Sequence, residues 1–443
     1  MYEAKETKEI TKKAFLVGLA EGQESGAEVR EHLAELQELV RTLGLATCGE
    51  LCASVREINP RYYVGSGKAE EISNAAAEAQ ADVIVFDSPL GPSQQRNLER
   101  LCKRHVIDRQ EVILDIFASR AWTKEAVLQV ELARNRYFLP RLTGAWSHLS
   151  RQRGGGGTVV RGAGETQLET DRRALKQRIS EQEAELAEVR KQRSVQRKSR
   201  LRSNISNAAI VGYTNAGKST LLNTLTGSEA YAANQLFATL DPTTRHLTLP
   251  DKSEILLTDT VGFVRKLPHS LVEAFKSTLE EAVLADFIIL VLDASSPAVM
   301  SQWETTLSVL SELGADQKEM LVVFNKMDLA GQDPVLQVKL RSLDTEAVFV
   351  SCVTGEGLDQ LKQKIMYKLA SKNALLYVRI PARDSGAIAQ LHSNGKIINS
   401  HYSPDGDFYA TVRVPAAYKK RLEPYFVNEN IYTGNEIPLS ERR

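Results

Sequence analysis

The chain of 443 residues lacks any long apolar run. The longest, Phe287 to Leu292, is far shorter than the roughly 18 residues that a membrane-spanning helix needs. The charged N-terminus, Met1 to Lys13, has no apolar core and does not fit a signal peptide. Cysteine is scarce, and the pair Cys48 and Cys52 has no second pair or histidine at metal-ligand spacing. We therefore expect a cytoplasmic protein with reduced thiols and no transmembrane segment.

Net charge is also absent, because 56 Lys and Arg balance 56 Asp and Glu. The balance is uneven along the chain. No Asp or Glu occurs between Arg134 and Arg161, where basic residues alternate with Tyr137, Phe138 and Trp146. Arginine binds phosphate bidentately and aromatic rings stack on exposed bases, so this stretch predicts an RNA contact. The predicted RNA-binding residues are Arg134, Arg136, Arg141, Arg151, Arg153 and Arg161.

A second acid-free basic run extends from Val189 to Arg202. It fits a solvated helix face as well as an RNA contact.

A phosphate-binding motif lies near the middle of the chain. Residues 212–219 match the pattern G-x-x-x-x-G-K-[ST] between an apolar strand and the start of a helix. Free N–H groups and the helix dipole favour phosphate there. Lys218 is expected on the β- and γ-phosphates, and Ser219 on Mg²⁺. The predicted nucleotide contacts of this loop are Gly212, Tyr213, Thr214, Asn215, Ala216, Gly217, Lys218, Ser219 and Thr220.

Three downstream motifs complete a nucleotide site. Asp259 ends an apolar strand, the position that orders Mg²⁺, and the following Thr260, Val261 and Gly262 would approach the γ-phosphate. Asp328, in the sequence Asn325-Lys326-Met327-Asp328, only accepts hydrogen bonds, which suits the two adjacent donors of guanine and disfavours adenine. Backbone amides of Ser351, Cys352 and Val353 are placed to close over the base. The sequence therefore predicts GTP binding.

No catalytic side chain is evident. Ras-like enzymes carry a Gln after the Asp-x-x-Gly glycine to position the attacking water, and this chain has Phe263 there. An apolar ring neither donates nor accepts a hydrogen bond, so we expect slow unaided turnover.

The pattern of elements predicts an α/β multidomain chain. Residues 1–164 should form an α/β domain with a loop rich in Gly and Arg, and residues 165–202 a helical arm. Residues 203–372 should form a GTPase domain with a mostly parallel sheet, and residues 373–443 a small α+β domain. Gly65-Ser66-Gly67-Lys68 lacks the first glycine of the phosphate-loop pattern, so we interpret it as a turn before a helix.

The order of these motifs resembles the translation-factor-related GTPases, and the whole layout resembles the HflX family within the Obg and HflX branch. The resemblance rests on residues 161–169, where Ala163 replaces the usual Pro, and on the sequence Phe-Ala-Thr-Leu-Asp. It implies that the loop with the sequence Phe-Ala-Thr-Leu-Asp contacts GTP through its residues Phe237, Ala238, Thr239, Leu240 and Asp241. It also implies that Thr239 ligates Mg²⁺, with Thr243 as the alternative, and that Asn215 favours activation by K⁺.

Family resemblance further implies a monomer that binds the large ribosomal subunit and ribosomal RNA and splits or rescues stalled ribosomes under stress. Two alternatives share the same motifs. One is a GTPase that assists ribosome assembly or RNA modification. The other is a GTP-gated RNA-binding protein with little hydrolysis, which Phe263 makes plausible.

Overall fold

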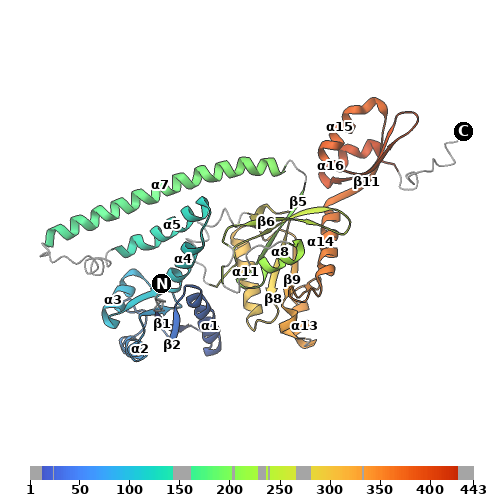
Figure 1. Cartoon of the computed structure of the whole chain (residues 1–443). Coiled ribbons are helices and arrows are strands. Elements are labelled where there is room, and N and C mark those ends of the chain that lie inside the picture. Colours follow the sequence, from blue (N-terminus) through green and yellow to red (C-terminus); the bar gives the residue numbers. More distant parts are fainter. Residues whose placement is uncertain are drawn as a thin grey trace, which may run out of the picture.

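The computed structural model describes residues 12–22, 24–142, 161–201, 205–227, 236–237, 240–265, 281–331 and 334–427. They form three separate sheets with flanking helices, which confirms the predicted α/β multidomain architecture (Figure 1). Among these residues, no helix is long and apolar enough to cross a bilayer.

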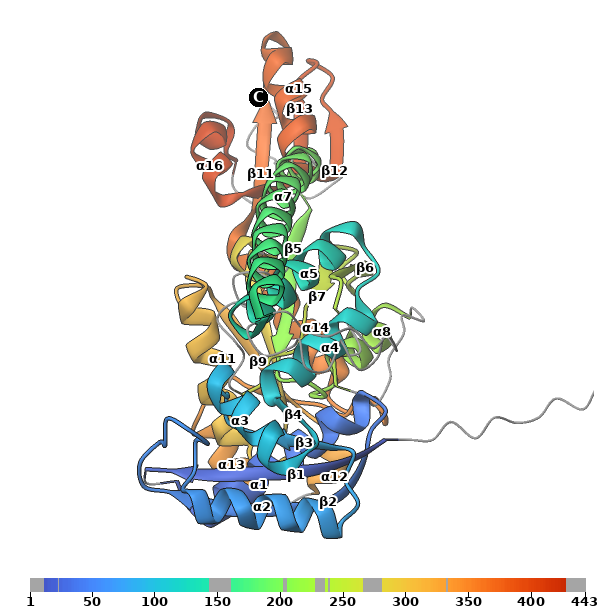
Figure 2. The same cartoon turned by 90° about the vertical axis from the view of Figure 1, so that its left-hand side faces the viewer.

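The N-terminal domain is a four-stranded parallel sheet in the order β2-β1-β3-β4. Its helices lie on both faces (Figure 2): α1 and α4 pack on one apolar face, and α2 and α3 on the other. The elements are β1 (Lys13–Glu21), α1 (Gly26–Thr42), β2 (Ala46–Val55), α2 (Ser66–Glu78), β3 (Val83–Phe86), α3 (Pro92–Cys102), β4 (His105–Asp108) and α4 (Arg109–Arg120). Helix α1 begins with a reciprocal capping box, in which Ser25 and Glu28 each accept the other's backbone N–H.

Two strands of this sheet differ from the sequence expectation. The sequence of residues 51–58 predicts a strand, but β2 begins at Ala46 because the residues before Leu51 already pair with β1, across a register shift. The four-residue strand β4 was not expected, since so short a run gives little periodicity. The turn expected around Gly65 is present, and Gly65 is the residue that caps α2.

A helical arm follows. Helix α5 (Lys124–Phe138) packs against the 41-residue helix α7 (Arg161–Leu201), with Leu128, Leu132 and Leu186 buried between them. Gln182 interrupts the apolar pattern, and its amide bonds to Asn135 and Glu131 of α5. The basic run that begins at Val189 continues this helix. The glycine-rich composition predicts that Gly162 and Gly164 belong to a loop, but α7 starts at Arg161 and includes both residues.

The central domain is a six-stranded sheet in the order β10-β9-β8-β5-β7-β6, parallel except for β6. Apolar residues fill both faces, as the continuous apolar strands predict. The elements are β5 (Ser206–Gly212), α8 (Lys218–Thr226), β6 (Thr243–Thr248), β7 (Glu254–Asp259), β8 (Phe287–Asp293), α11 (Val299–Glu312), β9 (Met320–Asn325), α12 (Met327–Ala330), α13 (Pro334–Arg341), β10 (Val348–Phe349) and α14 (Leu358–Lys372).

The C-terminal domain is a three-stranded antiparallel sheet in the order β11-β13-β12, continuous with the end of α14. Helices α15 and α16 cover one face of this sheet. The elements are β11 (Asn373–Ile380), α15 (Ser385–Asn394), β12 (Lys396–Tyr402), β13 (Phe408–Pro415) and α16 (Ala416–Leu422).

The N-terminal and central domains share one hydrophobic core. It passes from Leu36 of α1 and Phe117 of α4 to Phe237 and Phe263, which lie beside the predicted phosphate site. The rings of Phe117 and Phe237 meet edge to face, with centroids 4.5 Å apart. The N-terminal domain is therefore packed directly on the loops expected to surround the nucleotide.

Candidate nucleotide site

The phosphate loop leaves β5 at Gly212 and enters α8 at Lys218, as the motif predicts. Gly217 has a positive φ of 95°, and a Cβ there would lie 2.2 Å from Asn325 Nδ2. Asn325 Nδ2 instead donates to Ala216 O at 2.9 Å, while its Oδ1 accepts from Cys352 N at 3.2 Å. Asn325 thus ties the phosphate loop to the predicted base-binding segment.

Lys218 is the cation of this loop and is 6% exposed. Its Nζ donates to Tyr213 O at 2.8 Å. Burial lowers the pKa of Lys218 to about 8, although the Asp259 carboxylate acts in the opposite direction. The loop therefore holds a cation that it stabilises poorly, and a bound phosphate would supply the missing negative charge.

Gly262 packs against the phosphate loop from the opposite side. A Cβ at this position would lie 2.9 Å from Lys218 Nζ and 2.9 Å from Thr214 Cα. Buried Thr214 has a side-chain oxygen with no hydrogen-bond partner among the described residues. Thr260 and Val261, which precede Gly262 in the chain, are buried, and Thr260 Oγ1 donates to Ile210 O at 2.8 Å.

The side chains predicted to order Mg²⁺ meet at the start of α8. Ser219 Oγ donates to Asp259 Oδ2 at 2.6 Å. A hydroxyl and a carboxylate are the hard oxygen groups that Mg²⁺ takes, so Ser219 would hold the ion and Asp259 would orient it. In the described residues, no group of three His, Cys, Asp or Glu side chains could hold a metal alone. A magnesium ion shared with phosphate and water fits this arrangement.

The predicted base-binding residues converge at the ends of β9 and β10. Asp328 Oδ1 accepts the Ser351 hydroxyl at 2.6 Å, and Lys326 Nζ pairs with Asp293 Oδ2 at 2.7 Å. Burial raises the pKa of the Cys352 thiol to about 12, so it remains protonated at neutral pH. Met327 N donates to Val350 O at 3.2 Å, and Val353 is exposed. Asp328 is therefore held in place by protein contacts before any base is bound.

We expect Asp328→Asn to weaken GTP binding and relax base choice. The change replaces one acceptor with a donor, and hydrogen bonds to charged groups contribute about 1.5–3 kcal/mol each. Losing one such bond to guanine predicts a loss of roughly 10- to 150-fold in affinity. Xanthosine triphosphate, which has a carbonyl where guanine has its amine, should bind the variant better than the parent protein.

Fluorescence titration with both nucleotides measures this effect, and Asp359→Asn is the matched control because its side chain is 97% exposed. Unchanged affinity and unchanged guanine preference would remove Asp328 from the site.

The position of Phe263 explains why it cannot orient water. Its side chain is 1% exposed and lies in the core shared with the N-terminal domain. Its backbone extends the sheet toward the phosphate loop, since Phe263 O accepts from Thr214 N at 2.7 Å and Phe263 N donates to Gly212 O at 3.0 Å. Phe263 therefore has a packing role, and water must be positioned by other groups.

The loop predicted to sense the γ-phosphate is turned toward the N-terminal domain. Phe237 and Leu240 are buried in the shared core, and Asp241 accepts from Thr123 N at 3.2 Å. Ala238 and Thr239 lie outside the described residues, so their contacts remain predictions. The alternative Mg²⁺ ligand, Thr243, begins β6 and pairs with Asp259 in the sheet.

Sequence reasoning missed an ion cluster of Glu35, Asp87, Arg109 and Arg265, which joins the N-terminal domain to the nucleotide site. Arg109 is 1% exposed and lies 2.7 Å from Glu35 Oε2 and 2.8 Å from Asp87 Oδ1. Arg265 Nη2 lies 2.6 Å from Asp87 Oδ2. Burial alone would lower the pKa of Arg109, but the carboxylates of Glu35 and Asp87 raise it by more. The net pKa is above the usual value, so the guanidinium stays charged.

The ion cluster reaches the phosphate loop through Tyr213. The Tyr213 hydroxyl donates to Glu35 and accepts from Arg265 N at 2.7 Å. Burial and the neighbouring Glu35 raise the pKa of this phenol. Since Tyr213 O also accepts from Lys218, one residue links the N-terminal domain to the phosphate lysine. Asp87 and Arg109 directly follow β3 and β4, and charged groups at the carboxyl ends of parallel strands were the available signal.

The predicted RNA-binding arginines fall in different environments. Arg134 pairs with Asp115 at 3.1 Å and Arg136 with Glu183 at 2.7 Å, and both remain partly exposed. Arg161 is the first residue of α7, and Arg151 and Arg153 lie outside the described residues. RNA contact by these residues remains a prediction.

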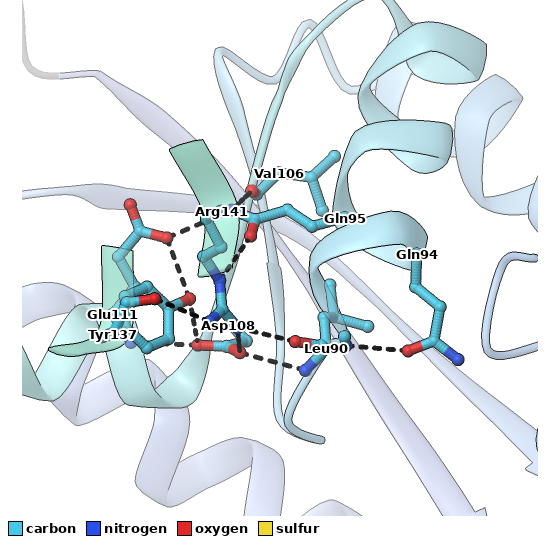
Figure 3. Close-up of polar contacts among 9 residues, drawn as sticks. Leu90, Gln94, Gln95, Val106, Asp108, Glu111, Tyr137 and Arg141 are labelled. Atoms are coloured by element: carbon cyan, nitrogen blue, oxygen red, sulfur yellow. Dashed lines mark hydrogen bonds and ion pairs between the residues drawn. The ribbon is translucent and has the colours of Figure 1, made fainter. Parts of the chain in front are cut away.

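Arg141 is more buried than Arg134 and Arg136, and RNA contact by it stays a prediction. Its guanidinium donates to Leu90 O at 2.7 Å and to Gln95 Oε1 at 2.9 Å, and it lies 3.5 Å from the centre of the Tyr137 ring (Figure 3). The side chain is 14% exposed and also faces buried Asp108. Arg141 therefore anchors the end of the α5 region to the N-terminal sheet, where it has little surface left for RNA.

Three known families match consecutive parts of the chain. Residues 30–118 match the family described as GTP-binding GTPase N-terminal, residues 120–200 match GTP-binding GTPase Middle Region, and residues 207–326 match 50S ribosome-binding GTPase. A GTP-binding protein of Sulfolobus solfataricus, solved with GDP, is 26% identical over 81% of this chain and 98% of its own, with a TM-score of 0.44.

Curated relatives are more similar. GTPase HflX of Akkermansia muciniphila is 46% identical over 97% of this chain and all of its own length. GTPase HflX of Escherichia coli is 42% identical over 88% of this chain and 92% of its own. The family matches and these two relatives show that the chain is a GTP hydrolase and belongs to the HflX family of GTPases.

Proposed function

We propose that this GTPase binds the large ribosomal subunit in the cytoplasm and splits or rescues stalled ribosomes as a monomer, with Mg²⁺ bound beside the nucleotide. The observation that carries the proposal is the match of residues 207–326 to a family described as 50S ribosome-binding GTPase. The arm adds geometric support, because 41 helical residues span about 60 Å, enough to reach deep into a large particle.

The segment that leads into the arm contacts the nucleotide site. Thr123, the N-cap of α5, donates its backbone N–H to Asp241, and Phe117 of α4 packs on Phe237; both partners belong to the loop expected to sense the γ-phosphate. A partner that shifts α4 or the start of α5 would therefore displace this loop. Since Phe263 cannot position water, we propose that such a partner completes the hydrolytic arrangement. A potassium ion at Asn215 stays a prediction, because a left-handed turn with a φ of 60° also accounts for Asn there.

We expect the double change Arg151→Gln and Arg153→Gln to weaken ribosome association and to remove the ribosome-stimulated part of GTP hydrolysis. Each arginine–phosphate contact contributes roughly 0.7–0.9 to the slope of log affinity against log salt, so the slope should fall by about 1.4–1.8. Sedimentation with ribosomes and separated subunits across a salt series measures it.

The matched control is Arg30→Gln with Arg56→Gln, which removes the same charge from exposed positions of the N-terminal domain. Basal hydrolysis should be unaffected in both proteins. An unchanged affinity and salt slope in the Arg151 and Arg153 variant would show that this stretch is a solvated linker. Binding to precursor RNA but not to mature subunits would favour the assembly alternative.

A further inference from the structure

Arg265 is held through its backbone and through its side chain. Its N–H donates to the Tyr213 hydroxyl at 2.7 Å, and its carbonyl oxygen accepts from Arg109 Nε at 3.1 Å. Its guanidinium lies 2.6 Å from Asp87 Oδ2 and 3.7 Å from Glu35 Oε2. The side chain is 13% exposed, so these charges are weakly screened by solvent. Contacts at three separate groups therefore fix this one residue.

The anchors of Arg265 come from two domains. Glu35 lies on α1, Asp87 follows β3 and Arg109 begins α4, all in the N-terminal domain. Tyr213 belongs to the phosphate loop, and its hydroxyl donates to Glu35. Because the phenol proton is directed at Glu35, the oxygen is free to accept from the Arg265 N–H. Burial and the neighbouring Glu35 raise the pKa of Tyr213, so this arrangement persists at neutral pH.

The segment from Gly262 to Arg265 is short and tightly packed. Phe263 forms a parallel β-bridge with Tyr213, and Val264 is fully buried. Three residues advance the chain by about 11 Å at most, so Gly262 lies close to the anchored residue. Close-packed interiors transmit displacement, since there is no empty space to absorb it. A shift of Arg265 therefore changes the position of Gly262.

Gly262 is the point at which this segment meets the expected γ-phosphate. A Cβ on Gly262 would lie 2.9 Å from Lys218 Nζ, so its backbone and the phosphate lysine border the same small space. Glycine has more backbone freedom than other residues, and an anchor further along the chain limits that freedom. GDP has no γ-phosphate to contact Gly262. The placement of Gly262 therefore matters for GTP and much less for GDP.

We propose that Arg265 is a positioning residue for γ-phosphate recognition, through which the N-terminal domain sets the preference of the site for GTP over GDP. Its action is indirect, because it holds the segment that carries Gly262. The inference rests on GTP binding at the phosphate loop and does not depend on the partner named in the proposed function. A residue that only joined the two domains would affect both nucleotides alike.

The test is isothermal titration of the full-length protein in Mg²⁺ with GDP and with a non-hydrolysable GTP analogue that has an imido β–γ bridge. Arg265→Met keeps an unbranched side chain and removes its charge. Losing a well-placed hydrogen bond to a charged phosphate should weaken binding of the analogue about 10-fold or more. Affinity for GDP should equal that of the parent. Arg265→Lys keeps a cation beside Asp87 and should bind the analogue more tightly than Arg265→Met.

Tyr213→Phe is the second variant, because it removes the acceptor of the Arg265 N–H and leaves every charge of the ion cluster in place. It should show the same selective loss for the GTP analogue. Arg245→Gln is the matched control, since Arg245 is exposed on β6 of the same sheet and should bind both nucleotides as the parent does. Urea unfolding checks that each variant is folded, and if Arg265→Met is not, Tyr213→Phe decides the outcome.

Three results would overturn the proposal. They are equal losses for the analogue and for GDP, parent-like binding of the analogue in Arg265→Met and Tyr213→Phe, and no difference between Arg265→Met and Arg265→Lys. Stimulation by ribosomal subunits is a separate measurement on the parent protein. Its failure would contradict the proposed function and leave the role of Arg265 unaffected.

Discussion

Lys218→Ala should weaken GTP binding by roughly 10²-fold or more while leaving the protein folded. Its ammonium group would make charge-assisted hydrogen bonds to the β- and γ-phosphates, each contributing about 1.5–3 kcal/mol. Losing two predicts a fall in affinity of roughly 10²-fold or more. The unfolding free energy should not fall, because burial already lowers the pKa of Lys218 and the folded protein stabilises this cation poorly.

Isothermal titration with Mg²⁺-GTP measures the affinity, and urea unfolding measures the stability. Lys339→Ala is the matched control, since Lys339 lies exposed on α13 of the same domain. If Lys218→Ala binds GTP as the parent does, or if it unfolds, the phosphate-loop assignment is wrong.

Arg109→Ala should be the most destabilising single change outside the nucleotide site. The substitution removes the more buried of the two cations and leaves Glu35 and Asp87 to share Arg265 alone. Removing one partner of a buried ion pair costs about 3–5 kcal/mol, and here two carboxylates then face a single positive charge. Urea titration should show this loss of unfolding free energy in the transition of the N-terminal domain.

Arg41→Ala provides the comparison. Arg41 also pairs with a carboxylate, Glu38 at 2.8 Å, but its side chain is 63% exposed. Exposed ion pairs contribute about 0–1 kcal/mol, so this variant should unfold close to the parent. Equal stability of the Arg109 and Arg41 variants would mean that the ion cluster does not hold the two domains together.

The parts of the site that sequence could predict are local in the chain. Residues 212–219 form one continuous loop, and Asp259 and Asp328 each follow an apolar strand whose type is evident from composition. Parallel strands bring their carboxyl ends to one edge, so the meeting of these motifs follows from the fold class. The α/β architecture was predictable for the same reason.

The parts that sequence could not predict depend on tertiary contact. Glu35, Asp87, Arg109 and Arg265 come from four separate segments, and each alone resembles an ordinary surface charge. The burial of Arg141 could not be predicted, because an acid-free stretch says nothing of Asp108, which precedes it by more than thirty positions and faces it in space. Gly162 and Gly164 were placed in a loop on intrinsic propensity, which tertiary context overrides.

The central claim is that this GTPase acts with the large ribosomal subunit, and GTP turnover with and without purified large subunits tests it most directly. Buried Phe263 cannot orient water, so turnover of the protein alone should be slow. Large subunits should raise it by about one order of magnitude or more, as partners that complete a GTPase site do. Turnover that is unchanged by large subunits, or raised equally by small subunits, would contradict the account.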